Sequence, residues 1–124
     1  MKEQILTPVF SPQKILVVAL GLAIAIALVA LLIYQIRMAD PYVRSVLSLN
    51  GRIAQGNAIF QMNCSGCHGQ QANGKVGPSL RGVAERRSQI SLIHQITSGK
   101  TPPMPEFQVS PEEMADLLSY LKTL

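Results

Sequence analysis

The chain has 124 residues, of which 48% are hydrophobic and 15% charged, with two Cys, no Trp and a formal net charge of +4. Two Cys cannot build the disulfide framework of a small secreted protein, which excludes that class. Much of the hydrophobic content lies in one block, so only about 70 residues remain for a water-soluble fold. A core of that size usually needs a metal or cofactor for stability, and it is too small for a large catalytic cleft.

The 22 residues from 15 to 36 carry no charge and form an apolar block after an N-terminal tail, residues 1–14. As a helix the block would extend about 33 Å, which matches a bilayer hydrocarbon core of about 30 Å. A buried helix of a soluble protein is excluded, because the rest of the chain is too small to bury it. A cleaved signal peptide is disfavoured, because its apolar region would be about 7–15 residues long and no small-residue cleavage site follows. The block therefore predicts a retained transmembrane anchor.

After the anchor we expect a connector over residues 37–51, followed by an all-helical domain over residues 52–124. The connector contains Pro41 and Gly51, although its apolar residues allow a short turn of helix at the membrane surface. The chain has no β-strand alternation and no internal repeat, so the fold class is predicted to be all-α. Apolar or small residues at helical spacing predict three helices, marked by Ile53, Gly56 and Phe60; by Ile90, Ile93 and Ile96; and by Met114, Leu117, Leu118 and Leu121.

The last of these helices has the clearest start signal. Ser110 as N-cap, Pro111 at the first helical position and Glu113 three residues after Ser110 form the pattern of a capping box. Glu112, Glu113 and Asp116 place negative charge near the positive end of the helix dipole. We therefore expect a helix that begins at Pro111.

The segment Cys64-Ser65-Gly66-Cys67-His68 is the C-x-x-C-H signature of c-type haem attachment. Two Cys three apart on a tight turn can each form a thioether to a porphyrin vinyl group, and the His that follows is delivered beneath the iron. A redox dithiol would be expected in a βαβ context and a zinc site would need a second ligand pair, and the sequence has neither signal. The motif predicts one haem c attached to Cys64 and Cys67, with His68 as an axial ligand.

The other axial position has several candidates. Met62 lies too close to the motif to reach the opposite face of the ring, and Met114 belongs to the apolar face of the last helix. His94 lies on a short amphipathic helix, where an exposed or hydrogen-bonded His is the ordinary role. Met104 lies among prolines in the connector 98–109, which can join neither a helix nor a sheet. We expect Met104 to be the second axial ligand. The alternative ligand is His94, and the alternative role of Met104 is to fill a gap in the core.

Pro78 follows the motif by ten positions, within the Gly-rich loop of residues 69–82. This length of chain is enough to fold back beside His68. A backbone carbonyl there can accept the ring N–H and fix the tautomer that a metal-bound His requires. An ordinary loop proline is the alternative. We therefore expect Pro78 to orient His68 from outside the iron's ligand set.

Residues 52–124 resemble a class I (mono-haem) cytochrome c. Gly56 and Phe60 resemble the N-terminal helix of that family, and Leu117 and Tyr120 resemble the residues of its C-terminal helix that cross this pair. With its anchor and small size, the chain looks most like the cyanobacterial cytochrome cM group. The resemblance implies a single N-terminal transmembrane helix followed by a small helical domain around one covalently bound haem.

The expected site residues also match the family's pattern. The Gly-Pro-x-Leu segment at residues 77–80 is similar to the one whose proline carbonyl holds the proximal His, and Met104 with the proline after it resembles the distal-ligand loop. The resemblance therefore implies His68 and Met104 as axial ligands. Met104 follows His68 by only 36 positions, which is short for the family and suggests a trimmed distal loop with a more open haem edge.

The charges that flank the anchor leave its orientation open. Lys2 and Lys14 precede it, whereas Arg37, Arg44 and Arg52 follow it, so the positive-inside rule does not favour a cytoplasmic N-terminus. Proteins of the resembled family receive haem on the lumenal or periplasmic side. The resemblance thus implies that the domain faces the lumen or periplasm, at a thylakoid or plasma membrane if the chain is cyanobacterial.

The leading functional hypothesis is an electron carrier, not an enzyme, that moves single electrons between membrane complexes such as an oxidase, a cytochrome b-type complex or a photosystem. Residues 37–124 carry nine Lys or Arg and six Asp or Glu, a net +3. Cations in the loops expected near the haem favour an acidic docking site on the partner, with a mixed solvated surface as the alternative; they are Lys75, Arg81, Arg86, Arg87 and Lys100. Neither a nucleic-acid partner nor a small-molecule substrate is expected.

Two other functions remain open at this point. One is a haem sensor that exchanges Met104 for an external ligand. The other is a fixed haem subunit, or regulatory partner, of a larger oxidase or photosynthetic complex. A filled sixth position disfavours oxygen chemistry, and Met/His ligation raises the reduction potential, so the carrier is the preferred hypothesis.

Overall fold

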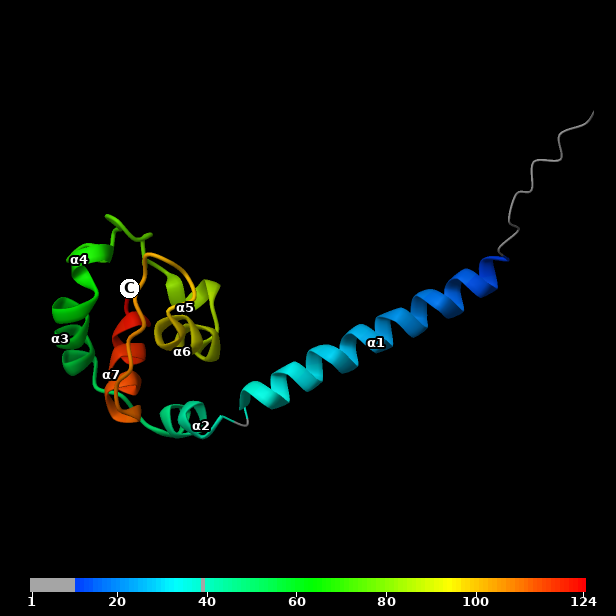
Figure 1. Cartoon of the computed structure of the whole chain (residues 1–124), viewed down its shortest axis with the longest axis horizontal. Helices are drawn as coiled ribbons and strands as arrows, with labels where there is room; N and C mark the ends of the chain where they lie inside the picture. Colours follow the sequence, from blue (N-terminus) through cyan, green and yellow to red (C-terminus); the bar gives the residue numbers. More distant parts are fainter. Residues whose placement is uncertain (1–10, 39) are drawn as a thin grey trace, which may run out of the picture. The chain divides into compact units, whose positions relative to one another are not determined.

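The computed structural model describes residues 11–38 and 40–124, so most of the predicted tail, residues 1–14, lies outside the described part. Contacts divide the chain into two compact units, Met1–Ile36 and Arg37–Leu124. The described residues form seven helices and no strand (Figure 1), which confirms the predicted all-α class. These helices are α1 (Pro12–Met38), α2 (Pro41–Ser48), α3 (Ile53–Asn63), α4 (Ser65–His68), α5 (Val83–Arg86), α6 (Gln89–Ser98) and α7 (Pro111–Leu121).

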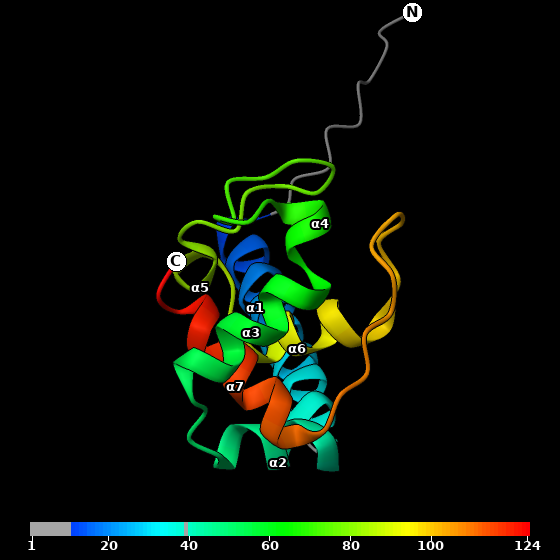
Figure 2. The ribbon, with the colours of Figure 1, turned by 90° about the vertical axis from the view of Figure 1, so that its left-hand side faces the viewer.

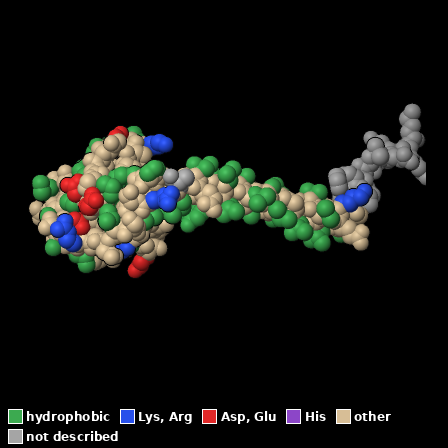
Figure 3. All heavy atoms as spheres, turned by 90° about the horizontal axis from the view of Figure 1, so that it is seen from below, with side chains coloured by type: hydrophobic (Ala, Val, Ile, Leu, Met, Phe, Trp, Pro, Cys, Tyr) green, Lys and Arg blue, Asp and Glu red, His purple; other side chains and the backbone are tan. Residues whose placement is uncertain are grey.

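Helix α1 contains the whole apolar block, residues 15–36, and none of its residues is buried. On the face drawn in Figure 3, hydrophobic side chains cover the length of the helix and basic side chains stand at its ends. Its 27 residues extend about 40 Å, enough to cross a hydrocarbon core of about 30 Å. Among the described residues it is the one helix long and apolar enough to do so. Exposed apolar surface of this extent is unfavourable in water, so α1 needs an apolar environment.

Helix α2 occupies most of the segment that we expected to be a connector, residues 37–51. The Asp40 side chain accepts a backbone N–H of the first turn at 2.9 Å, which starts the helix. Val43 and Val46 lie three apart on one face, and both are buried where α2 contacts α6 and α7. The sequence allowed a short turn of helix in this connector, and the structure adds that its two valines are buried in the core of the globular unit.

The core of this unit is built on the crossing of α3 and α7, which lie side by side in Figures 1 and 2. A Cβ atom at Gly56 would lie 1.9 Å from the Asp116 carbonyl oxygen, so only Gly lets the two backbones approach this closely. The fully buried Phe60 ring packs against Tyr120, with ring centroids 5.3 Å apart and planes tilted by 49°. The predicted crossing of Gly56 and Phe60 with Tyr120 is confirmed, whereas Ile53, expected on the same face, is 53% exposed.

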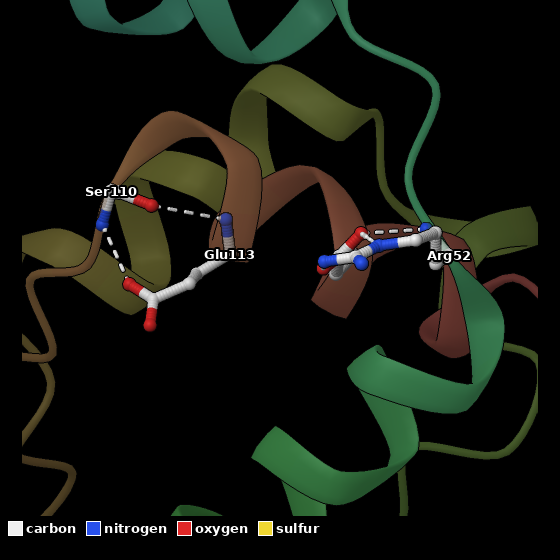
Figure 4. Close-up of polar contacts among 4 residues, drawn as sticks. Arg52, Ser110 and Glu113 are labelled. Carbon is white, nitrogen blue, oxygen red and sulfur yellow. Dashed lines mark hydrogen bonds and ion pairs between the residues drawn. The ribbon is translucent and has the colours of Figure 1, made fainter.

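Helix α7 begins as predicted. The Ser110 hydroxyl accepts the Glu113 N–H at 3.2 Å, and the Glu113 carboxylate accepts the Ser110 N–H at 3.0 Å (Figure 4). Two backbone donors at the start of the helix are thereby satisfied. Met114 is fully buried in the next turn, which confirms its assignment to the core.

Asp116 has a role that the sequence did not predict. Its carboxylate is buried, accepts the backbone N–H of Arg52 at 2.6 Å and pairs with the Arg52 guanidinium at 3.0 Å (Figure 4). The hydrogen bond from the Arg52 side chain lowers the pKa of Asp116. Because Arg52 immediately precedes α3, the pair ties the start of α3 to the middle of α7.

Replacing Asp116 with Asn should reduce the acid sensitivity of the fold. The folded-state pKa of Asp116 lies below its ordinary value of 3.8, so the carboxylate contributes stability above that pH. This contribution is lost as the pH falls through the folded-state pKa. We expect the free energy of unfolding of the native chain to fall below about pH 4, and that of Asp116→Asn to fall less over the same interval.

Guanidinium unfolding of the full chain in detergent, repeated at several pH values, measures this difference. Glu112→Gln is the matched control, because Glu112 is exposed on the same helix. Parallel pH profiles for the native chain and Asp116→Asn would show that the Arg52–Asp116 pair does not govern acid stability.

Candidate haem-binding site

The motif residues are placed by the end of α3. The Cys64 N–H donates to the Phe60 carbonyl at 2.8 Å, and the His68 N–H donates to the Cys64 carbonyl at 2.9 Å, so α4 continues from α3 as one turn. Cys64 is half-buried and Cys67 exposed, and both are free thiols. Residues three apart on a helix lie on the same face, which is the arrangement that two thioethers to one porphyrin require.

The ring of His68 is buried and held in one orientation. Its Nδ1 lies 2.8 Å from the Pro78 carbonyl oxygen, which can only accept, so Nδ1 carries the proton and donates. Nε2 is then the atom with a free lone pair. A Cβ atom at Gly77 would lie 2.7 Å from the ring's Cε1 atom, so the Gly77 backbone packs directly on the imidazole. The structure thus brings Pro78 and His68 together, and it adds Gly77, whose role the sequence did not reveal.

The loop of residues 69–80 is fixed by backbone hydrogen bonds to the end of α4. The Gly77 N–H donates to the Cys67 carbonyl at 2.7 Å, and the Gly74 N–H donates to the His68 carbonyl at 2.7 Å. Both acceptors are terminal carbonyls that have no partner within the helix. The position of the proline carbonyl therefore follows from the backbone, which returns to the same turn that carries the motif.

Met104 lies on the loop between α6 and α7, half-buried against the core. Its N–H donates to the Thr101 carbonyl at 2.9 Å, which forms a tight turn. The Gln95 side-chain amide of α6 donates to the Met104 sulfur at 3.7 Å, and the Thr101 hydroxyl lies 3.5 Å from the Gln95 oxygen. Gln95 was missed in the sequence, where the only signal was a polar residue on a short apolar helix. The sulfur and the His68 ring are held by separate parts of the domain.

The other axial candidates differ in their surroundings. Met62 is 83% exposed, and Met114 is fully buried in the core. Nε2 of His94 is buried and has no hydrogen-bond partner among the described residues. Because a buried imidazole nitrogen without a partner is uncommon, His94 stays the alternative axial ligand.

A redox dithiol and a zinc site fit these residues poorly. Burial, with a contribution from Cys67, raises the pKa of the Cys64 thiol to about 11, whereas a reactive dithiol needs a lowered pKa. In residues 11–38 and 40–124, no group of three or more His, Cys, Asp or Glu is placed to hold a metal ion. Two thiols on one helical face, beside an imidazole whose Nε2 is free, fit covalent haem instead. This combination defines a c-type cytochrome domain.

Comparison with known proteins agrees with this class. Residues 51–121 match the family described as cytochrome C oxidase, cbb3-type, subunit III. A cytochrome c-553-like protein of Synechocystis sp. is 54% identical over 101 residues, which cover 82% of this chain and 96% of the relative. Cytochrome c-550 of Bacillus subtilis is 28% identical over 71 residues, covering 57% of this chain and 58% of the relative. The crystal structure of cytochrome cL from Hyphomicrobium denitrificans superposes with a TM-score of 0.50 at 28% identity, over 67% of this chain and 51% of that one.

The chain therefore belongs to the cytochrome c family, and its cofactor is covalently attached haem c. The Synechocystis relative confirms the resemblance to the small cyanobacterial cytochromes of the cM group. Because the chain belongs to this family, it is assigned to the general class of electron-transfer proteins.

Gly77→Ala should weaken the expected bond between His68 and the haem iron. The added Cβ would lie 2.7 Å from the ring, so the imidazole must tilt away from the Pro78 carbonyl. Loss of such an orienting contact typically costs about 10-fold in metal affinity. We expect the pH at which acid converts the low-spin haem spectrum to a high-spin one to rise by about one unit.

Gly66→Ala is the matched control within the motif, because a Cβ atom there meets nothing within 4 Å. An acid titration of the absorption spectrum compares the two variants with the native chain. Identical midpoints for all three would mean that the packing of Gly77 does not orient His68.

Proposed function

We propose that this chain is a membrane-anchored c-type cytochrome that carries single electrons between membrane redox complexes. Haem c is attached at Cys64 and Cys67, and its iron is ligated by His68 and Met104. The observation that carries the proposal is the orientation of the His68 ring. Its Nδ1 donates to the Pro78 carbonyl, which leaves Nε2 free next to two thiols on the same turn.

Haem c supplies one-electron chemistry through the ferrous and ferric states of its iron. The protein holds the His68 ring with backbone atoms of Gly77 and Pro78, and it holds the Met104 sulfur with Gln95. Ligands fixed by the fold change position little between oxidation states, which favours rapid electron transfer. The roles left to the chain are to hold the group and to dock a partner, and these are the roles of a carrier and not of an enzyme.

The anchor in this proposal is α1, which crosses the membrane once. Its length and apolar surface support this assignment. The haem domain then faces the lumen or periplasm, where c-type haem is attached in the family. The Synechocystis relative supports a thylakoid or plasma membrane of a cyanobacterium.

The partners in this proposal are an oxidase, a cytochrome b-type complex or a photosystem. The five cations that the sequence places in loops near the haem are all exposed, and their charge can steer association with an acidic docking site; they are Lys75, Arg81, Arg86, Arg87 and Lys100. The domain as a whole, residues 37–124, carries nine Lys or Arg against six Asp or Glu, a net +3.

Met104→Leu tests the distal ligand. We expect the oxidised native protein to show the near-infrared charge-transfer band of a sulfur–iron bond, and we expect Met104→Leu to lose it, because Leu has no donor atom. The reduced variant should bind CO rapidly, whereas the native protein should not. Met62→Leu is the control, since Met62 is exposed and should leave the spectrum unchanged. A native protein without the band, whose spectrum changes in His94→Leu, would assign the position to His94.

A fixed subunit of an oxidase is the second candidate, and the description of the matching family as an oxidase subunit III favours it. Purification of the full chain in mild detergent separates the two functions. A diffusing carrier should elute with no partner in constant ratio, because its complexes are short-lived. Co-elution with oxidase subunits at fixed stoichiometry across several detergents and salt concentrations would favour the subunit instead.

A further inference from the structure

Helix α2 lies before the residues that match the family. The family match begins at residue 51, whereas α2 spans Pro41–Ser48. Val43 and Val46 are among the largest fully buried side chains of the described residues, and α2 contacts both α6 and α7. Burial of a Val side chain contributes about 2 kcal/mol. The helix is therefore a fixed part of the globular unit and not a flexible tether.

A side-chain hydrogen bond also fixes α2 to the rest of the domain. The Tyr42 hydroxyl donates to the Val109 carbonyl at 3.0 Å, directly before the N-cap of α7. The Tyr42 ring is half-buried against the core, and burial raises its pKa. The buried valines and the Tyr42 hydrogen bond both attach α2 to the domain, so the helix moves with the domain.

The chain between the two helices is very short. Helix α1 ends at Met38 and α2 begins at Pro41, so residues 39 and 40 alone separate them. Three Cα-to-Cα steps of about 3.8 Å limit this separation to about 11 Å, whatever the angle between the helices. A free connector over residues 37–51 would have reached about 50 Å. Folding of α2 therefore removes most of the reach that the sequence predicted.

The outer face of α2 suits the surface of a bilayer. Its exposed residues are Pro41, Arg44, Ser45 and Ser48, and Arg37 is exposed in the last turn of α1. Arg side chains favour the phosphate level of the headgroups, and none of the exposed residues of α2 has a large apolar side chain. These exposed residues therefore suit the headgroup region and not the hydrocarbon.

We propose that α2 holds the haem domain at the bilayer surface. The redox partner of the domain is then an integral protein of the same membrane, which binds the domain beside the lipid headgroups. This inference rests on the proposed function of α1 as a membrane anchor. The 88 residues from 37 to 124 form a body about 30 Å across, so the haem stays within about 40 Å of the bilayer. A membrane-resident partner meets the domain at raised effective concentration in this thin layer, whereas a soluble partner gains nothing.

Lengthening the tether tests the proposal. Twelve Gly and Ser residues inserted directly after Met38 add about 20 Å of average reach and leave α1 and α2 intact. The layer within reach of the haem then grows from about 40 Å to about 60 Å, which lowers its effective concentration about 1.5-fold. In native membranes that carry the variant in place of the native chain, we expect haem oxidation by the membrane partner to slow about 1.5-fold.

The same twelve residues added after Leu124 provide the control, because they add mass without lengthening the tether. Oxidation by ferricyanide, a soluble oxidant, should be equal in all three proteins. If the insertion after Met38 leaves the rate of oxidation by the membrane partner unchanged, the proposal is overturned. A faster rate would also overturn the proposal, because it would place the docking face farther from the lipid. Release of the native chain by alkaline carbonate would instead overturn the anchoring itself, and the inference with it.

Discussion

The close approach of two backbones, α3 against α7, is the constraint on which the haem-binding turn depends. It is possible because Gly56 in α3, and Gly51 just before α3, have no Cβ; at each position a Cβ would lie 1.9 Å from a carbonyl oxygen of α7. Phe60 then packs one turn further along α3, and Cys64 follows one turn after Phe60. The thiols therefore sit at a place that the helix crossing defines, even though they do not take part in it.

The two expected iron ligands are supported in different ways. His68 is held by backbone atoms, with Nδ1 2.8 Å from the Pro78 carbonyl and Gly77 packed on the ring. Met104 is held by a side chain, the Gln95 amide 3.7 Å from its sulfur, on a loop that is mostly exposed. A backbone contact has little freedom to vary, whereas a contact from an amide side chain is weaker and more adjustable. Substitution of one side chain, Gln95, is therefore enough to alter the distal side, whereas the proximal side changes only when the backbone packing at Gly77 is disturbed.

Apart from the helix crossing that the family resemblance implied, the features that the sequence predicted correctly are those with local signals. The capping box of Ser110 and Glu113 and the haem motif each lie within five consecutive residues, and a helical period is visible over two turns. The features it missed join distant parts of the chain. Arg52 and Asp116 are 64 positions apart, and neither residue is unusual in its own neighbourhood. Contacts of this kind depend on how the helices cross, which no local pattern records.

The burial of α2 has the same origin and the largest consequence. The sequence allowed a short turn of helix over these residues, but only the surface of α6 and α7 makes the burial of Val43 and Val46 favourable. A domain of this size has little core, so the two valines, at about 2 kcal/mol each, are a substantial share of its stability. Stability and reach are thereby coupled, because freeing α2 to lengthen the tether would expose both side chains to water. A domain held together in this way gains stability from the same segment that keeps it close to the end of α1.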